Sequence, residues 1–103
     1  MLKYDHNKNM RKIKSTKQIE RHMKGISNHW RIAIILLLNE SEPLTLDSLV
    51  EELKMNTKTA SEHTRRLNHA GLINKKYLGR EVFHSLSPYG KTFASFLKTF
   101  QHS

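Results

Sequence analysis

The sequence predicts a mainly α-helical fold of about five helices with one small, two-stranded β-hairpin. Five segments carry apolar residues at helical spacing, and each begins beside a residue type that caps helices. Two short β-rich runs lie on either side of Gly79, which is the pattern of a hairpin. The chain has 103 residues, of which 37% are hydrophobic. This content is enough for one modest core, so we expect a single folded domain.

The first part of the chain predicts an arm followed by two helices. Residues 1–15 are polar and basic and lack apolar periodicity, so we expect a flexible arm before a folded domain at 16–103. Ser15 and Thr16 are suited to cap the first helix, and Gly25 and Ser27-Asn28 loosen or end it. The next segment, HWRIAIILLLNE, is apolar on nearly all sides and predicts a buried central helix. Its isoleucine pairs are the one argument for a strand instead.

Two short helices are predicted after a break at Pro43. Thr45 is suited to cap the first of them, whose leucines and valine share one face. A connection of about three residues then leads to the second helix. This second helix covers residues 56–70, with Asn56 as its cap and Gly71 after its end. Its inward stripe is Ala60, Thr64 and Leu67.

A basic hairpin and a final helix complete the predicted order. The runs LINKKYL and VFHSL are joined through Gly79 and Arg80, which predicts a hairpin over residues 72–86. Ser87 caps the last helix, and Pro88 takes its first position, where a missing N–H costs nothing. An apolar stripe then follows this helix through Phe93, Phe96, Leu97 and Phe100.

The charge of the chain points to an anionic partner. It holds 18 Lys and Arg against 9 Asp and Glu, a formal net charge of +9. A small protein this basic most often binds nucleic acid, although a basic protein without such a partner is the alternative. The bases concentrate in residues 3–24 and 54–80, whereas residues 40–52 carry five acids and no base. The chain is therefore polarised along its length.

Several classes of function lack support in the sequence. No cysteine is present, which excludes disulfides and thiolate metal sites and suits a reducing cytoplasm. No apolar run is long enough to span a membrane, and the N-terminus lacks the apolar core of a signal peptide. We therefore expect a cytoplasmic protein. Neither a Gly-rich phosphate loop nor a catalytic motif occurs, so we expect no enzyme and no cofactor.

The two short helices and the basic hairpin together make a helix-turn-helix with a β-wing. In that arrangement the second helix enters the major groove of double-stranded DNA. Its first turns then need short polar side chains that reach base edges. The bases of the hairpin are suited to contact backbone phosphates or the minor groove. The predicted DNA-binding residues are Thr57, Lys58, Thr59, Ser61, Glu62, Arg65, Lys75, Lys76 and Arg80.

From Asn28 to Leu86 the sequence resembles the winged helix-turn-helix repressors of the arsenic-repressor (ArsR) type. Arg31 precedes the central apolar helix as in that family, and SEHTRRLNHAGLI follows its pattern Ser-x-His-Leu-x-x-Leu-x-x-Ala-Gly-Leu-Val. The wing GREVFHSL is similar to the family's Gly-Arg-x-x-x-Tyr-x-Leu. The ending HSLSPYGKTFASFL is closer to the multiple-antibiotic-resistance (MarR) regulators. The resemblance implies a sequence-specific transcriptional regulator, typically a repressor.

The sequence also departs from this family pattern. Thr64 replaces an expected leucine, and its hydroxyl is expected to bond back to its own helix. Lys54 replaces a frequent glycine in the turn, and His84 stands where tyrosine is usual. The cysteine pairs and the His, Asp and Glu clusters of the metal-sensing members are missing. We therefore expect no metal site, and the effector, if there is one, is unknown.

The first and last helices carry the apolar stripes expected of a homodimer interface. In the resembling family these two helices pair across a two-fold axis, and a chain this short has little core left for a terminal helix. Two copies would read two half-sites of a palindromic operator, about one helical turn apart. The predicted interface residues are Ile19, Met23, Ile26, Phe93, Phe96, Leu97 and Phe100.

Alternatives remain open at the level of the sequence. A winged helix can instead serve as a protein-interaction adaptor, or as a non-specific nucleic-acid-binding protein. The basic arm either stays solvated or follows phosphates beside the main site. Glu62 either accepts a hydrogen bond from a cytosine amine or repels a phosphate.

The histidines give a further set of alternatives. His63 falls between the two faces of its helix, so it is either packed or solvated, or it contacts a phosphate. His22 and His29 are expected at the surface or at its boundary. A zinc site made by His63, His69 and His84 is the remaining metal hypothesis.

Overall fold

The computed structural model describes residues 13–103, and its elements follow the predicted order of helices around one hairpin. Most of the predicted N-terminal arm, residues 1–12, lies outside the described residues. Among the helices of residues 13–103, none combines the length and the apolarity needed to span a bilayer. The elements are α1 (Thr16–Ile26), α2 (His29–Glu40), β1 (Leu44–Thr45), α3 (Leu46–Leu53), α4 (Thr57–His69), β2 (Ile73–Leu78), β3 (Glu81–Leu86) and α5 (Pro88–Gln101).

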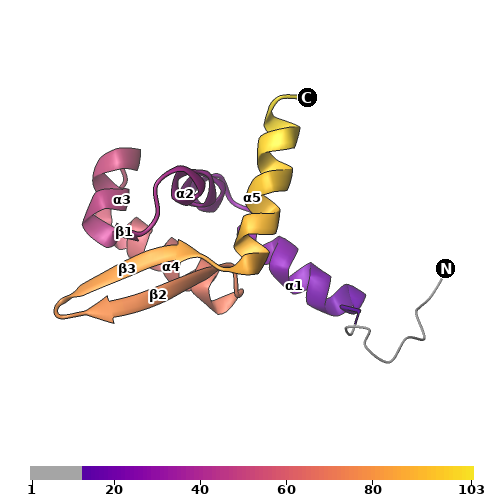
Figure 1. Ribbon diagram of the computed structural model, residues 1–103, viewed down its shortest axis with the longest axis horizontal. Helices are drawn as coiled ribbons and strands as arrows, with labels where there is room; N and C mark the ends of the chain where they lie inside the picture. The colour runs from indigo at the N-terminus through magenta and orange to yellow at the C-terminus, as the bar shows by residue number, and fades with distance from the viewer. Residues whose placement is uncertain (1–12) are drawn as a thin grey trace.

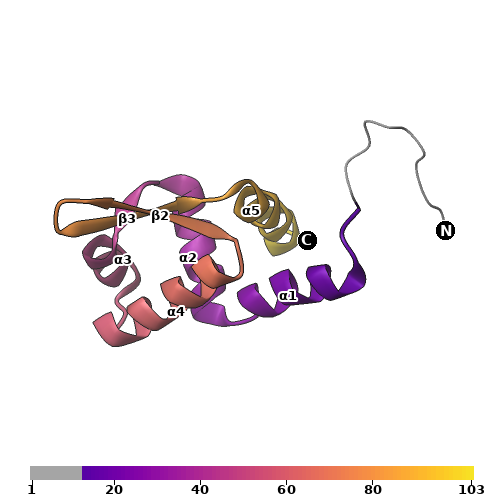
Figure 2. The same cartoon turned by 90° about the horizontal axis from the view of Figure 1, so that it is seen from below.

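The strands form a wing that reaches beyond the helices. Figure 1 shows β2 and β3 extending to one side, with α3 above them and α5 standing upright at their other end. In Figure 2 the molecule is seen from below, and α4 and α1 lie on the near side. The prediction of five helices and a β-wing is confirmed.

The helices begin where the sequence predicts because each has a side-chain cap. Asn56 accepts hydrogen bonds from the backbone N–H groups of Lys58 and Thr59, at 2.7 Å and 3.2 Å. Ser15 forms a capping box with Gln18, in which each side chain bonds to the other residue's backbone. The remaining predicted caps, which accept from the first turns of their helices, are Asn28, Thr45 and Ser87.

The sheet has one strand that the sequence did not predict. Its order is β1-β3-β2, and the short β1 pairs antiparallel with β3, so that Leu44 lies opposite His84. Two residues are too few to give a periodic signal, so this strand follows from tertiary pairing. The predicted hairpin turns through Gly79 and Arg80, and Gly79 has a φ of +62°, which favours glycine.

The core is built around α2, and the strand alternative for this segment is wrong. Ile34, Ile35 and Leu38 are fully buried, as expected of a helix that is apolar on nearly all sides. The helix packs against α3, α4, α5 and β3. The buried apolar side chains around it come from the other elements and loops, namely Ile26, Leu49, Met55, Ala60, Leu67, Ala70, Leu72, Ile73, Leu86 and Ala94.

The inward stripe of α4 is the predicted one. Ala60, Thr64 and Leu67 are all buried. The Thr64 hydroxyl donates to the carbonyl of Ser61 at 3.1 Å, which satisfies the polar group that replaces the expected leucine. The opposite side of α4 is therefore left for solvent or a ligand.

Two residues of α1, His22 and Ile26, lie elsewhere than predicted. The helix itself ends at Ile26, just before the predicted Ser27-Asn28. A Cβ at Gly25 would overlap the Ala70 side chain, so the glycine allows α1 to approach the end of α4. His22 is buried rather than at the surface, and its Nδ1 donates to the Ala70 carbonyl at 2.8 Å. Ile26 is only 6% exposed and belongs to the core of its own chain, so its assignment to a dimer interface is wrong.

The turn before α4 supplies a test of backbone strain. Lys54 has φ 54° and ψ 48°, the left-handed conformation in which a Cβ costs energy. We expect Lys54→Gly to raise the free energy of unfolding by about 0.5–1 kcal/mol, measured by urea denaturation. The matched control, Lys54→Ala, keeps the Cβ and should give no such gain. An equal gain from both variants would show that the lysine side chain, rather than the backbone, is at fault.

Candidate nucleic-acid interface

The first turns of α4 present polar side chains that the fold leaves unused. Thr57, Lys58 and Ser61 are exposed, and their side chains form no hydrogen bond with any part of residues 13–103. Thr59 is half-buried. Lys58, Thr59 and Ser61 line one shallow hollow on the outer face of α4, together with Glu62, His63 and Arg65. Short polar groups that lack partners are the type of surface that base edges require.

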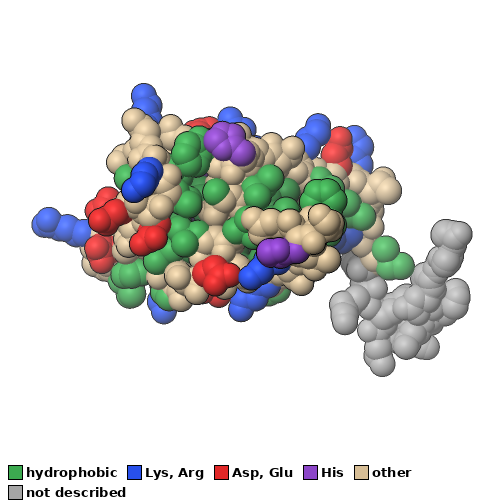
Figure 3. Space-filling model, turned by 90° about the horizontal axis from the view of Figure 1, so that it is seen from above, with side chains coloured by type: hydrophobic (Ala, Val, Ile, Leu, Met, Phe, Trp, Pro, Cys, Tyr) green, Lys and Arg blue, Asp and Glu red, His purple; other side chains and the backbone are tan. Residues whose placement is uncertain are grey.

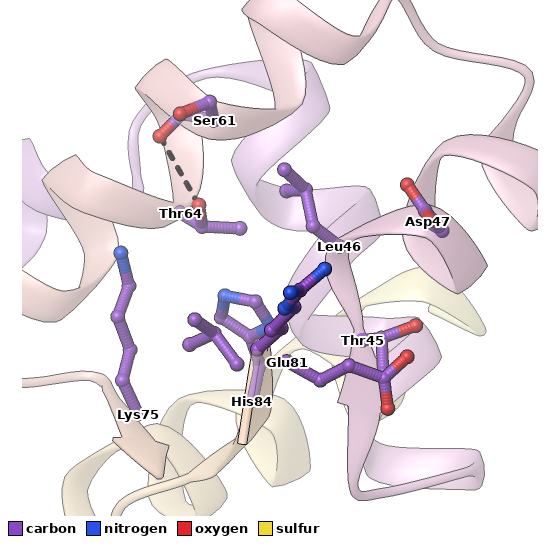
Figure 4. Close-up of a pocket in the computed structure, with 10 residues that line it drawn as sticks. Thr45, Leu46, Asp47, Ser61, Thr64, Lys75, Glu81 and His84 are labelled. Carbon is purple, nitrogen blue, oxygen red and sulfur yellow. Dashed lines mark hydrogen bonds between the residues drawn. The ribbon is translucent and has the colours of Figure 1, made fainter. Parts of the chain in front are cut away.

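Two of the predicted wing residues face α4 across a second hollow. Lys75 and Arg80 line it together with Ser61, so the hairpin and the recognition helix bound the same space. Figure 4 shows Lys75 pointing toward the segment of α4 that carries Ser61 and Thr64. Two acids, Asp47 and Glu81, also lie at its margin. This hollow brings the predicted residues of α4 and the wing together.

Lys76 is not part of that group. Successive side chains of a strand point to opposite faces, so Lys76 lies on the other side of the wing from Lys75. It lines a separate hollow with Glu42, Pro43 and Phe83. Of the three hairpin bases predicted to contact DNA, Lys75 and Arg80 share a cleft with α4, and Lys76 does not.

The predicted lysines and the wing arginine are not neutralised by the fold. Lys58, Lys75, Lys76 and Arg80 form no ion pair with the acids of residues 13–103. By contrast, the lysines of α5 are paired, Lys91 with Glu42 and Lys98 with Glu40. Positive charge is therefore available on the first turns of α4 and on the wing.

Glu62 holds two arginines on the outer face of α4. Its two carboxylate oxygens accept hydrogen bonds from Arg65 and Arg66, each at 2.7 Å. These hydrogen bonds, the one from Arg65 first, lower the pKa of Glu62 to about 2. The carboxylate is thus ionised at neutral pH and already has cationic partners. Its spacing of three and four residues from the arginines is the usual one for ion pairs on a helix.

His63 connects α4 with α2 through Arg31. Because a guanidinium group can only donate, Arg31 Nη1 donates to His63 Nδ1 at 2.9 Å, which leaves the imidazole proton on Nε2. Burial, and next the charge of Arg31, lower the pKa of His63. The half-buried, bonded position agrees with the packed alternative for this residue.

The three histidines of the zinc hypothesis have separate surroundings. His84 is buried, and its Nδ1 donates to the Leu44 carbonyl at 3.0 Å, while His69 is exposed at the end of α4. Across residues 13–103, no group of three or more His, Asp or Glu side chains is placed to hold a metal ion. His84 fills the position of the family's tyrosine with a hydrogen bond to the neighbouring strand β1.

Apolar side chains remain exposed on α1 and α5. Phe96 and Phe100 are 57% and 66% exposed, and their rings stack with centroids 5.6 Å apart. Ile19 and Met23 are also exposed, whereas Phe93 and Leu97 are half-buried against the core. Figure 3 views the molecule from the side toward which the end of α5 points, and hydrophobic side chains reach the surface there.

Two short helices, α3 and α4, followed at once by the hairpin of β2 and β3 are the arrangement of a winged helix-turn-helix. Residues 28–75 match the family model described as bacterial regulatory protein, arsR family. The resemblance to that family is confirmed, and the fold is that of a winged helix-turn-helix protein. No curated protein matches the sequence of the chain.

Solved structures of transcriptional regulators share the fold. HlyU from Vibrio cholerae is 22% identical, with a TM-score of 0.77, over 85% of this chain and 96% of that one. The homodimeric winged helix-turn-helix fragment of Mb0332 from Mycobacterium bovis, a possible ArsR-family regulator, is 19% identical, with a TM-score of 0.76, over 84% and 81%. The repressor PagR of Bacillus anthracis is 18% identical, with a TM-score of 0.73, over 80% and 94%.

Because His84 is buried in the wing, we expect the free energy of unfolding to fall in acid. Burial lowers the pKa of His84 below its ordinary value of 6.5, so protons bind preferentially to the unfolded chain. Stability from this residue is complete above pH 6.5 and is lost as the pH falls toward the lowered folded-state value. Urea unfolding at pH 7.5 and 5.5 should show this loss in the wild type, and a smaller loss in His84→Gln, whose amide can still donate to Leu44.

The exposed His29 supplies the control for this measurement. His29→Gln should retain the wild-type difference in the free energy of unfolding between the two pH values. If His84→Gln lost as much stability as the wild type over this interval, the acid sensitivity would have to arise elsewhere.

Proposed function

We propose that the chain is a sequence-specific transcriptional repressor that binds double-stranded DNA as a homodimer. The observation that carries this proposal is the start of α4. Exposed polar side chains there form no hydrogen bond within residues 13–103, and they lie beside Lys58, Lys75 and Arg80, which have no ion pair within that range. The fold alone does not decide between DNA and other partners. The chemistry of this surface favours DNA, because phosphates supply the missing anions and base edges supply the missing hydrogen bonds.

In this proposal α4 enters the major groove with its N-terminal half. Thr57, Lys58 and Ser61 meet base edges, since their side chains are exposed and the fold does not use their hydrogen-bonding groups. Lys75 and Arg80 contact phosphates of the strand that passes through the cleft between α4 and the wing. The Glu62 carboxylate orients Arg65 and Arg66 rather than reading a base itself.

The homodimer is proposed from the exposed apolar side chains of α1 and α5. A stacked pair of phenylalanines with most of its surface in water is unfavourable in an isolated chain, and a second copy would cover it. The related Mycobacterium bovis fragment is a homodimer, which supports the same arrangement here. Two copies would then read a palindromic operator.

The outer face of α4 can be tested as a DNA-reading face with Lys58→Ala and Arg65→Ala. Each substitution should weaken binding to a duplex selected from a random pool by about 1–3 kcal/mol if the residue reads a base, as measured in a band-shift titration. The control is Lys91→Ala, which removes the same kind of charge from α5. It should leave the affinity close to that of the wild type. If the variant that carries both substitutions bound every duplex as tightly as the wild type, the outer face of α4 would not be the surface that reads DNA.

An adaptor that binds proteins through the same fold is the competing function. Such a protein would not need unpaired cations on α4 and the wing, and its complexes would not show the counterion release typical of DNA binding. A steep loss of duplex affinity with rising salt favours the repressor. Equal affinity for structured RNA and duplex DNA would instead favour non-specific nucleic-acid binding.

The dimer can be tested with the double variant Phe96→Asp and Phe100→Asp. Two charges on the exposed side of α5 should leave the fold of a single chain intact and prevent pairing, because charges buried without partners are costly. Sedimentation should show a dimer for the wild type and a monomer for the variant. The matched control is Leu78→Asp, an exposed apolar residue on the wing, which should stay dimeric. A dimeric double variant would place the interface elsewhere.

A further inference from the structure

A fourth hollow lies between α1, α2 and α4, outside the base-reading turns and the wing. Helices α1 and α4 form the near side of the molecule in Figure 2, and they pack against each other there. Five of the described side chains that line this hollow are cationic, and none is acidic. They are Arg21 and Lys24 from α1, Arg31 from α2, and Arg65 and Arg66 from α4.

The close approach of α1 to α4 creates this concentration of charge. Gly25 lies against Ala70, where any larger residue would push the helices apart. Arg21 and Lys24 are three residues apart and therefore lie on one side of α1, beside the arginines of α4. Like charges held this close repel one another, so the arrangement is unfavourable unless an anion enters.

Arg31 is the buried member of the group and has unused hydrogen-bonding capacity. It is only 8% exposed, and its Nη1 is taken by His63. Its Nε has no hydrogen-bond partner anywhere in residues 13–103. Burial, and next the charge of Arg66, lower the pKa of Arg31, while the charge of Glu62 opposes this shift. A buried cationic donor without a partner is costly, and an oxyanion would relieve that cost.

The nearby carboxylates do not neutralise the hollow. Glu62 lies between Arg65 and Arg66, and its two oxygens are occupied by those residues. Glu20 pairs with Lys24 at 3.4 Å, but both side chains are largely exposed, and such pairs contribute little. The five cations therefore outnumber the acids next to them.

We propose that the hollow between α1, α2 and α4 is a phosphate-binding site, in which Arg31 and the α4 arginines bind the oxygens while Arg21 and Lys24 close it from α1. Arg65 lines both this hollow and the one on the reading face. A DNA strand on α4 would therefore bring a backbone phosphate within reach, and in that case the inference rests on the proposed function. A free phosphate or phosphate ester has the same chemistry.

The first experiment measures the binding of free inorganic phosphate to the full chain. Inorganic phosphate is titrated at constant ionic strength, with chloride as the balancing ion, while the NMR signals of His63 and His69 are followed. Saturable shifts are expected in the wild type and should be weakened at least tenfold in the double variant Arg21→Ser and Lys24→Ser. The matched control, Lys91→Ser with Lys98→Ser, removes the same charge from α5 and should bind phosphate as the wild type does.

The second experiment tests, with the same variants, whether the hollow contacts backbone phosphates of DNA. The slope of log affinity against log salt is determined on a selected duplex with long flanks, where each lost phosphate contact reduces the slope by about 0.9. In the double variant Arg21→Ser and Lys24→Ser, the slope should fall by the amount that corresponds to about one or two lost phosphate contacts, relative to the α5 control. A reduced slope identifies a backbone phosphate, and saturable phosphate binding with an unchanged slope identifies a free ligand.

The proposal is overturned if inorganic phosphate gives no saturable shift and the slopes of the two double variants are equal. If the wild type binds no duplex at all, the proposed function fails. The phosphate titration then decides the present inference alone, and the absence of a saturable shift overturns it.

Discussion

The burial of α2 is the constraint on which the rest of the molecule depends. Ile34, Ile35 and Leu38 have no exposed surface, and α3, α4, α5 and β3 all pack against this helix. These elements can be displaced only by uncovering apolar surface, so their positions relative to one another are fixed together. Helix α1 is different, because it rests mainly on α4, at the contact of Gly25 with Ala70.

Because of this constraint, α4 has an inner face that packs on the core and an outer face that stays exposed. The inner residues Ala60 and Thr64 are small, so the helix lies close to the core, and Leu67 anchors its second half. On the outer face, Glu62 binds the arginines of the second half, while the side chains of Thr57, Lys58 and Ser61 in the first half form no hydrogen bond within residues 13–103. The wing then bounds one side of the same surface through Lys75 and Arg80.

Local interactions were predictable from the sequence, and contacts between distant segments were not. The caps at Ser15, Asn28 and Asn56 involve residues two or three positions away, so their signal lies within one turn. The outer face of α4 was likewise predictable from helical period. The strand β1, the buried His22 and the bond between Arg31 and His63 each need a partner at least 32 positions away. For that reason the basic hollow beside α1 left no recognisable pattern in the sequence.

The cap of α4 has a consequence for how this scaffold can change its target. Asn56 secures the first turn through backbone N–H groups alone, so the turn forms whatever side chains follow the cap. The side chains of Thr57, Lys58 and Ser61 add no bonds within residues 13–103 that the fold would lose. Folding and target preference are thus encoded by separate sets of residues. A new preference can arise, by drift or by design, through a few exchanges in one helical turn while the hydrophobic core stays as it is.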